Sequence, residues 1–241
     1  MKQIAILLLV CLLFLGGCGK PERSLGTQIQ TAPAEQTYEA MVETASVETE
    51  PTEPQPEEPQ EDDFVRVLDY LPEASQELMY ATDQNFTGQR IYDFTEAYLR
   101  YGTVKKLALV AAELEQQGLY LKIWDGFRPV SAQLTLWEIC PNPTYVANPN
   151  TGFSSHSRGN TVDLTLVDAR GQEIEMPTGF DDFSALADRN YSDCTETAAA
   201  NARLLQETME KYGFSSYFGE WWHFSDTQTY PVEEIFEPAA G

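Results

Sequence analysis

The stretch from Gly19 to Asp62 limits what this 241-residue chain can fold into. It is rich in Glu, Thr, Pro, Gln and Ala, and four prolines between Pro51 and Pro59 interrupt any helix. Its two bases and eleven acids give a net charge of −9, and large apolar residues are almost absent. Such a segment resists compaction. We therefore predict an acidic tether over residues 19–62 and a folded domain over residues 63–241.

The residues before the tether predict export. Lys2 supplies a positive charge, and the uncharged apolar run from Ile4 to Leu15 is typical of a signal peptide but short for a membrane span. The run ends in Leu15-Gly16-Gly17-Cys18, which resembles the lipobox of bacterial lipoproteins. We predict a signal peptide over residues 1–18, lipidation of Cys18 and attachment to the outer face of the cytoplasmic membrane. The alternative is a plain secretory signal, which also predicts export.

The charge and the histidine count exclude two classes of function. The chain carries 38 acidic and 15 basic residues, and its net charge of −23 would repel phosphate backbones, which excludes nucleic acid as a partner. It contains two histidines, His156 and His223, so a metal centre of three or four histidines is excluded. A zinc site in this chain would need carboxylate ligands.

Two cysteines fall within the predicted domain, Cys140 and Cys194. Export permits a disulfide between them. On the chain-entropy description, closing a loop of this length would stabilise the fold by about 4 kcal/mol. The sequence leaves pairing and free thiols equally open. Zinc binding by either cysteine is the less favoured interpretation.

Apolar spacing predicts separated helices and hairpin-linked strands in the domain. Helical spacing precedes Gly118 and Gly213, glycines typical of helix ends, and residues 161–167 alternate polar and apolar as a strand does. We therefore predict an α+β fold, a single domain with a central antiparallel sheet flanked by helices. The predicted helices cover residues 104–117, 130–140 and 198–212, the strands 120–124, 161–167, 172–176 and 220–224, and a loop 142–150.

The first string with chemical content is Ser154-Ser-His156-Ser-Arg-Gly159-Asn-Thr-Val-Asp163. A histidine in a polar loop and an aspartate on the polar face of the next strand can deliver a nitrogen and an oxygen to one ion. Gly159 lets the loop turn sharply. The alternative is a surface histidine beside a solvated strand face.

The second string is Gly219-Glu220-Trp221-Trp222-His223-Phe224. Zinc peptidases need a carboxylate close to a metal ligand that takes a proton from water, and Glu220 is a candidate. On a straight strand Glu220 and His223 would point to opposite faces, so this hypothesis requires a bulge. The alternative is a buried aromatic strand with local polar contacts.

The third string is Trp124-Asp125-Gly126-Phe127-Arg128-Pro129, directly after a predicted core strand. Arginine is permanently charged, so Arg128 could face a developing oxyanion or a substrate carboxylate. The alternative is a surface salt bridge.

Together the three strings resemble those of the VanX-type D-alanyl-D-alanine dipeptidases. These belong to the zinc D,D-peptidases, which include VanY-type carboxypeptidases and share a fold with the Hedgehog signalling domain. The likeness runs from about Asp69 to Tyr230, and it departs at Thr161, where the family usually has alanine. Three further strings fit the family: Tyr80-Ala-Thr, Asn85-Phe-Thr-Gly88 and Gly179-Phe-Asp181.

The resemblance implies one zinc ion per chain, bound by His156, Asp163 and His223. It also implies that Glu220 is the general base and that Arg128 stabilises the tetrahedral intermediate. The implied substrate-binding residues are Ser154 at the substrate carboxylate, Asp181 and Tyr80 near its ammonium group, and Asp125, which would also orient Arg128.

The activity that the resemblance implies is zinc-dependent hydrolysis of D-Ala-D-Ala or related short D,D-peptides, here outside the membrane because of the export signal. The segment between Arg128 and His156 is shorter than in the vancomycin-resistance enzymes. We expect this difference to alter the top of the pocket and so the length of the peptide that the enzyme accepts. Two alternatives stay open. One is a D,D-carboxypeptidase that trims peptidoglycan stems, and the other is a non-catalytic, zinc-stabilised module that binds wall peptides or a protein partner.

Overall fold

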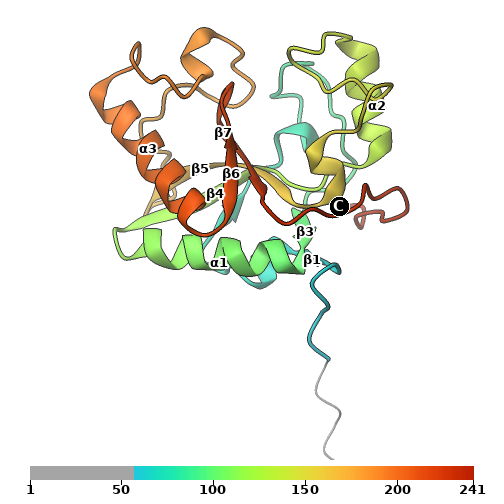
Figure 1. Cartoon of the computed structure of the whole chain (residues 1–241), viewed down its shortest axis with the longest axis horizontal. Helices are drawn as coiled ribbons and strands as arrows, with labels where there is room; N and C mark the ends of the chain where they lie inside the picture. The colour runs from blue at the N-terminus through green and yellow to red at the C-terminus, as the bar shows by residue number, and fades with distance from the viewer. Residues whose placement is uncertain (1–56) are drawn as a thin grey trace, which may run out of the picture. The chain divides into compact units, whose positions relative to one another are not determined.

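A five-stranded sheet lies at the centre of the computed structural model, which describes residues 57–241 (Figure 1). The predicted signal peptide, Cys18 and the tether up to residue 56 lie outside the described residues. The sheet order is β2-β4-β5-β7-β6, and all neighbours are antiparallel except β2 and β4. The strands are β2 (Ser75–Gln76), β4 (Leu119–Asp125), β5 (Thr161–Asp168), β6 (Phe214–Tyr217) and β7 (Glu220–Asp226).

Residues 57–241 form three α-helices beside this sheet, which confirms the predicted α+β class. They are α1 (Tyr101–Glu115), α2 (Val130–Ile139) and α3 (Glu196–Lys211), each within a few residues of its prediction. Helix α1 packs against β4 and α3, and α3 packs against β6 and β7. A second, two-stranded antiparallel sheet pairs β1 (Phe64–Arg66) with β3 (Tyr98–Arg100). Among residues 57–241, no helix has the length and apolar character that a membrane crossing requires.

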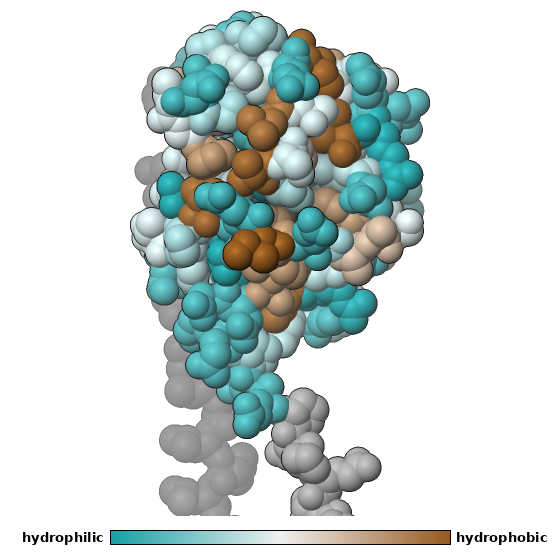
Figure 2. Space-filling view, turned by 90° about the vertical axis from the view of Figure 1, so that its right-hand side faces the viewer, coloured by the Kyte–Doolittle hydropathy of each residue, from teal (hydrophilic) through white to brown (hydrophobic). Residues whose placement is uncertain are grey.

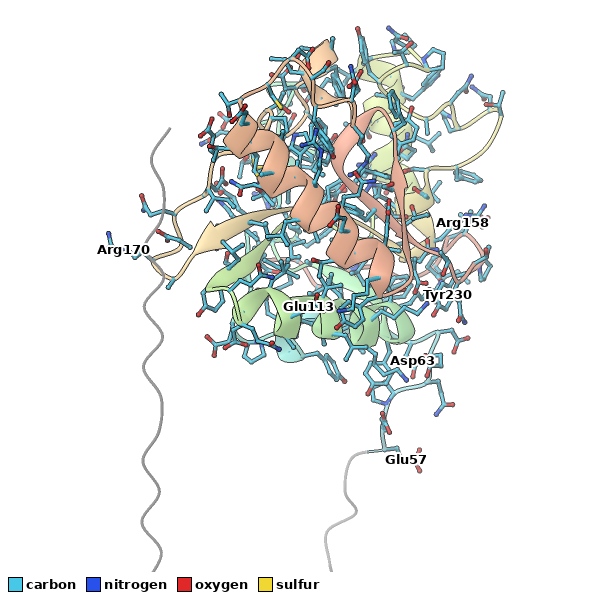
Figure 3. All side chains as sticks on the ribbon, turned by 60° about the vertical axis from the view of Figure 1, so that its left-hand side comes forward. Glu57, Asp63, Glu113, Arg158, Arg170 and Tyr230 are labelled. Atoms are coloured by element: carbon cyan, nitrogen blue, oxygen red, sulfur yellow. The ribbon has the colours of Figure 1, made fainter. Side chains whose placement is uncertain are left out.

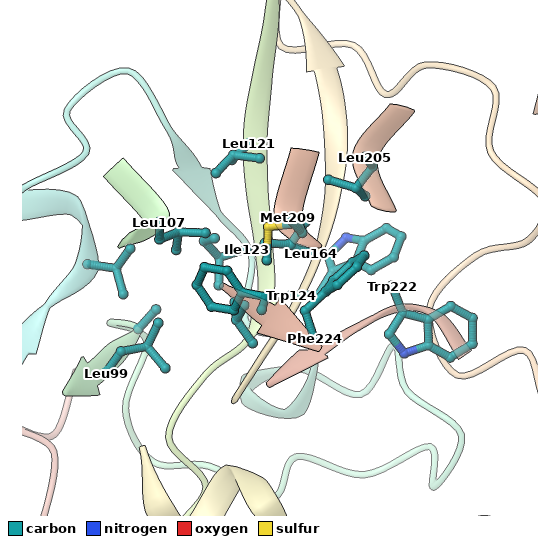
Figure 4. Packing of buried hydrophobic residues seen from close by; sticks show 14 of the residues in the cluster. Leu99, Leu107, Leu121, Ile123, Trp124, Leu164, Leu205, Met209, Trp222 and Phe224 are labelled. Atoms are coloured by element: carbon teal, nitrogen blue, oxygen red, sulfur yellow. The ribbon is translucent and has the colours of Figure 1, made fainter. Parts of the chain in front are cut away.

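The core lies between the central sheet and the helices α1 and α3. Leu164 of β5 packs in one cluster with Leu205 and Met209 of α3 (Figure 4). Since side chains alternate along a strand, Asp163 points to the opposite face of the sheet. That face is also covered, because Thr161, Asp163 and Thr165 are all buried. The solvated strand face considered for Asp163 is therefore wrong.

Two details of the sequence-based fold are corrected. The strand predicted over residues 172–176 is reduced to a single bridge between Val167 and Glu173, since this segment is mostly exposed and cannot bury an alternating face. Cys140 and Cys194, whose pairing was open, are free thiols.

The strand β7 contains the bulge that the second string requires. Ser216 lies opposite Phe224, but the next residue of β6, Tyr217, lies opposite Glu220. Three residues of β7 between these pairs have no partner on β6. Trp221 and Trp222 are consecutive and both fully buried, which a regular strand with one exposed face does not allow.

His156 lies on a short 3-10 helix, Ser155–Arg158. The C-terminal segment of the chain packs against this helix and fixes its position. Arg158 Nη1 donates to the Tyr230 carbonyl at 2.8 Å, and both residues lie side by side in Figure 3. The backbone N–H of Glu233 donates to the Ser157 carbonyl at 2.8 Å. Residues distant in sequence therefore fix the backbone around His156.

Helix α2 is less deeply packed. Ala132, Gln133 and Leu136 are buried, whereas Leu134 and Ile139 are exposed. The face of the molecule on the α2 side, which is the right-hand side of Figure 1, carries apolar patches between hydrophilic side chains (Figure 2). The one polar residue on the buried side of α2, Gln133, points toward the site described next.

Candidate active site

Three side chains from three elements form a compact cluster. His156 comes from the 3-10 helix, Asp163 from β5 and His223 from β7, and the sheet places Asp163 directly opposite His223. One ligand atom from each lies within 4.8 Å of the others. His156 and Asp163 are buried, and the His223 side chain is 16% exposed, so the cluster is open on one side.

The three side chains are close enough together to share one zinc ion, with one oxygen of Asp163 facing each histidine. His156 Nε2 lies 3.3 Å from Asp163 Oδ2 and 3.3 Å from His223 Nδ1, and Asp163 Oδ1 lies 3.0 Å from His223 Nδ1. Two zinc bonds of about 2.0–2.1 Å at the tetrahedral angle place their ligand atoms about 3.3 Å apart. Asp163 Oδ1 is buried without a hydrogen bond, and so has a lone pair to offer.

The tautomer of His156 also suits a ligand. Its Nδ1 lies 2.8 Å from the carbonyl oxygen of Gly126, and because a carbonyl only accepts, Nδ1 must carry the proton. The lone pair of the neutral ring is then on Nε2, which faces Asp163 and His223. Burial would raise the pKa of Asp163, but the two histidines hold that pKa below its ordinary value.

Glu220 lies beside the cluster without joining it. Its Oε2 is 3.6 Å from His223 Nδ1, which the bulge of β7 makes possible although the two residues are three apart. The side chain is 20% exposed. Burial raises the pKa of Glu220, with His223 acting in the opposite direction. A carboxylate with a raised pKa at this distance can exchange a proton with water in the cavity.

Arg128 is buried and held by its neighbours, so the surface salt bridge considered for it is wrong. Its Nε and Nη2 donate to Asp125 Oδ2 at 3.2 and 2.6 Å, and its Nη1 donates to Gln133 Oε1 at 3.1 Å. Burial would lower the pKa of Arg128, but Asp125 raises it well above its ordinary value. A guanidinium has five N–H donors. Two remain, one on each terminal nitrogen, and the side chain borders the cavity.

A cavity of about 280 Å³ opens over these groups. Tyr80, Ser154 and Asp181 line it, as do the metal-ligand candidates, Glu220 and Arg128. The other lining residues come from loops, from the start of the 3-10 helix and from the end of β6: Pro143, Thr144, Tyr145, Ala147, Phe153, Ser155, Phe183 and Tyr217.

The four predicted substrate-binding residues divide into two groups. Ser154, Asp181 and Tyr80 line the cavity, whereas Asp125 does not. Asp125 is fully buried beneath Arg128, where its Oδ1 accepts hydrogen bonds from the Tyr92 hydroxyl at 2.8 Å and the Gly126 N–H at 2.9 Å. With both oxygens occupied by the protein, Asp125 orients Arg128 and is not a substrate contact.

Asp181 is in an unusual environment for a carboxylate. Its φ of 55° is in the left-handed region, its Oδ2 is buried without a hydrogen bond, and burial, together with the charge of Asp163, raises its pKa well above the ordinary value. Such a group is stabilised by a positively charged partner that enters the cavity.

Residues 60–239 match the family model for peptidase M15, described as D-Ala-D-Ala dipeptidase. This chain belongs to that family. It is therefore an enzyme of the metallopeptidase class. The D-alanyl-D-alanine dipeptidase of Escherichia coli strain K12 is 37% identical over 163 residues, which cover 67% of this chain and 84% of the relative. That of Enterococcus faecalis is 33% identical over 186 residues, covering 68% of this chain and 91% of the relative.

Among solved structures, VanYB in complex with D-Alanine-D-Alanine aligns with a TM-score of 0.37 and 16% identity. The alignment covers 55% of this chain and 73% of that one. Membership of the M15 family rests on the sequence matches.

Sequence reasoning missed several residues that complete this M15 site. Tyr92 and Gln133 hold Asp125 and Arg128, and Tyr145 and Phe183 stack over the cavity at 4.7 Å between ring centroids. Gln133 carried one usable signal, a polar residue on the apolar side of a predicted helix. The other three lie in segments without periodicity, where nothing local reveals a long-range contact.

Proposed function

We propose that this M15 peptidase hydrolyses D-Ala-D-Ala and closely related short D,D-peptides with one zinc ion bound by His156, Asp163 and His223. The observation that carries this proposal is the convergence in one cavity of two histidines and an aspartate that can share one ion, a carboxylate beside them that is 20% exposed, and an arginine with two free N–H groups. The D-alanyl-D-alanine dipeptidase names of the relatives support the substrate.

The catalytic steps follow from the residues of the chain. A bound zinc ion supplies a Lewis acid that polarises a carbonyl and makes water acidic near neutral pH. Glu220 accepts the proton of the attacking water and returns it to the leaving amine. The two free N–H groups of Arg128 face the carbonyl oxygen, on which negative charge develops, and Asp125 and Gln133 keep the guanidinium in that orientation.

The two ends of a dipeptide find complementary groups. Ser154 Oγ accepts the His156 N–H at 3.3 Å, which leaves its hydroxyl proton free for the substrate carboxylate. Asp181, with its unpaired Oδ2, is the partner for a free ammonium group. A D-Ala-D-Ala dipeptide carries both charges, whereas a peptidoglycan stem places a neutral amide at Asp181. This difference favours the dipeptidase over the carboxypeptidase.

The test is a zinc-replete assay with D-Ala-D-Ala, N-acetyl-D-Ala-D-Ala and a pentapeptide ending in D-Ala-D-Ala. We expect kcat/KM to fall at least about 30-fold on N-acetylation, because removing one partner of a buried charge pair costs about 2–5 kcal/mol. Glu220→Ala is the inactive control. Faster cleavage of the pentapeptide than of the dipeptide would establish the carboxypeptidase instead, and no hydrolysis by zinc-loaded protein would favour the binding module.

We also propose that the enzyme is exported and anchored by a lipid on Cys18, so that it acts outside the membrane during cell-wall turnover. The apolar run, the lipobox-like string and the acidic tether support this location. Fractionation tests the proposal: Cys18→Ala should release the protein from the membrane fraction, and unchanged membrane association would contradict lipidation.

A further inference from the structure

The bulge of β7 interrupts the pairing of β6 with β7, and the proposed ligands do not explain what keeps the bulge in place. Trp221, Trp222 and His223 have no residue opposite them on β6, so the regular hydrogen-bond ladder between the two strands is interrupted. Glu220 and His223 share one side of the sheet only while this bulge persists. Some other group must hold the hairpin in this shape, because buried backbone carbonyls need donors.

Arg189 donates to carbonyls on both strands of the hairpin. Its Nε donates to the Tyr217 carbonyl on β6 at 2.8 Å, and its Nη2 donates to the His223 carbonyl on β7 at 3.0 Å. The backbone N–H of Arg189 donates to the Phe218 carbonyl at 3.0 Å. Arg189 thus bridges the two strands where their ladder is interrupted, and it contacts the backbone carbonyl of His223, one of the metal-ligand candidates.

The guanidinium is itself held in place. Its carbon lies 4.5 Å from the centre of the Phe224 ring, and its Nη1 donates to the Tyr191 hydroxyl at 3.2 Å and to Gln206 Oε1 at 3.4 Å. Gln206 belongs to α3, so the contacts connect the hairpin to a core helix. Burial lowers the pKa of Arg189, yet arginine stays charged at any physiological pH.

We propose that Arg189 is a positioning residue for the zinc centre: by bridging the Tyr217 and His223 carbonyls, it keeps the bulge that places His223 at the metal and Glu220 beside it. The inference rests on the proposed zinc peptidase. Lysine cannot replace Arg189, because an ammonium on a flexible stem lacks the planar fork that donates along two directions.

The test compares Arg189→Ala with Arg203→Ala. Arg203 is a matched control, because it is exposed on α3 and packs over the same Tyr191 ring at 5.4 Å, but donates no hydrogen bond to the hairpin. Zinc affinity is measured by competition with a chelator, and kcat and KM with D-Ala-D-Ala. We expect Arg189→Ala to lose about 10–100-fold in zinc affinity and in kcat, as for other groups that orient metal ligands, with KM little changed. Arg203→Ala should match the wild type in all three.

Two further measurements separate positioning from general destabilisation. Added guanidinium ion at non-denaturing concentration should restore part of the zinc affinity of Arg189→Ala, whereas ammonium ion should not. Arg189→Lys, which keeps the charge, serves if Arg189→Ala fails to fold, and it should still lose zinc affinity at temperatures well below its unfolding midpoint. Wild-type zinc affinity and kcat in either folded variant would overturn the proposal.

Zinc affinity is measured without substrate, so the two proposals can fail separately. Reduced zinc affinity of Arg189→Ala, in a protein whose wild type cleaves no D,D-peptide, would support the role of Arg189 and overturn the proposed activity. A wild type that binds no zinc would overturn both.

Discussion

The floor and the roof of the cavity are built in different ways. The floor, consisting of Arg128, His156, Asp163, Glu220 and His223, comes from the sheet and the segments next to it, and its members are between buried and one-fifth exposed. The roof, consisting of Tyr145, Phe153, Phe183 and Tyr217, comes from loops and a strand end. Tyr145 is 42% exposed and Tyr217 is 54% exposed.

The difference separates chemistry from substrate choice. Floor residues are fixed by directional contacts, such as the paired hydrogen bonds between Arg128 and Asp125, and a displaced group there loses its function. The roof is held by the stacked rings of Tyr145 and Phe183, which join two loops through apolar contact. We therefore expect floor substitutions to reduce kcat and roof substitutions to change which peptides enter.

The largest effect is expected at the ligand cluster of the floor. His156→Ala and His223→Ala should each lose zinc and activity together, because two remaining ligands cannot complete a three-residue site. Metal content after dialysis and the rate with D-Ala-D-Ala measure both. A variant that keeps one zinc per chain would remove that histidine from the proposed ligand set.

Glu220→Gln should separate proton transfer from metal binding. The amide keeps the size of the side chain but cannot accept a proton, so kcat should fall by about 10²–10⁴-fold. Zinc content should stay at the wild-type level, since Glu220 lies outside the ligand cluster. Substantial remaining kcat would show that another group accepts the proton.

Arg128→Ala should reduce kcat by about 10²–10³-fold, as loss of one preorganised oxyanion donor does in other enzymes. Zinc again stays bound. Because the substitution leaves the buried Asp125 without its cationic partner, the thermal unfolding midpoint should also fall, and the rate must be measured well below it. An Arg128→Ala enzyme with wild-type kcat would exclude this role.

The smallest effect is expected at the roof. Tyr145→Ala removes the ring that stacks on Phe183, so the rate with D-Ala-D-Ala should change only a few-fold, while kcat/KM for the pentapeptide rises relative to the dipeptide. Leu134→Ala, at an exposed position that does not line the cavity, is the control and should leave this ratio unchanged. An unchanged ratio in Tyr145→Ala would remove the roof from substrate selection.

The longer elements could be predicted because their burial pattern repeats locally. Val104, Leu107 and Leu114 of α1 recur at helical spacing and are all fully buried. The strands β1, β2, β3 and β6 were missed, because two to four residues are too few to display a period. The alternation of β5 was recognised, but not that its polar face is buried, because burial of Asp163 depends on segments far away in sequence.

The sequence by itself determined the chemical inventory and its order along the chain. It supplied two histidines, an aspartate near the start of a strand, a glutamate three residues before the second histidine and an arginine ahead of a proline. Each string alone left a second interpretation open, and the resemblance of the three together to the zinc D,D-peptidases indicated one kind of site. Only the tertiary structure decided that Glu220 and His223 share a side, that Asp125 serves Arg128 and not the substrate, and that Arg189 spans the bulge. These are questions of register and long-range hydrogen bonding, which local periodicity does not record.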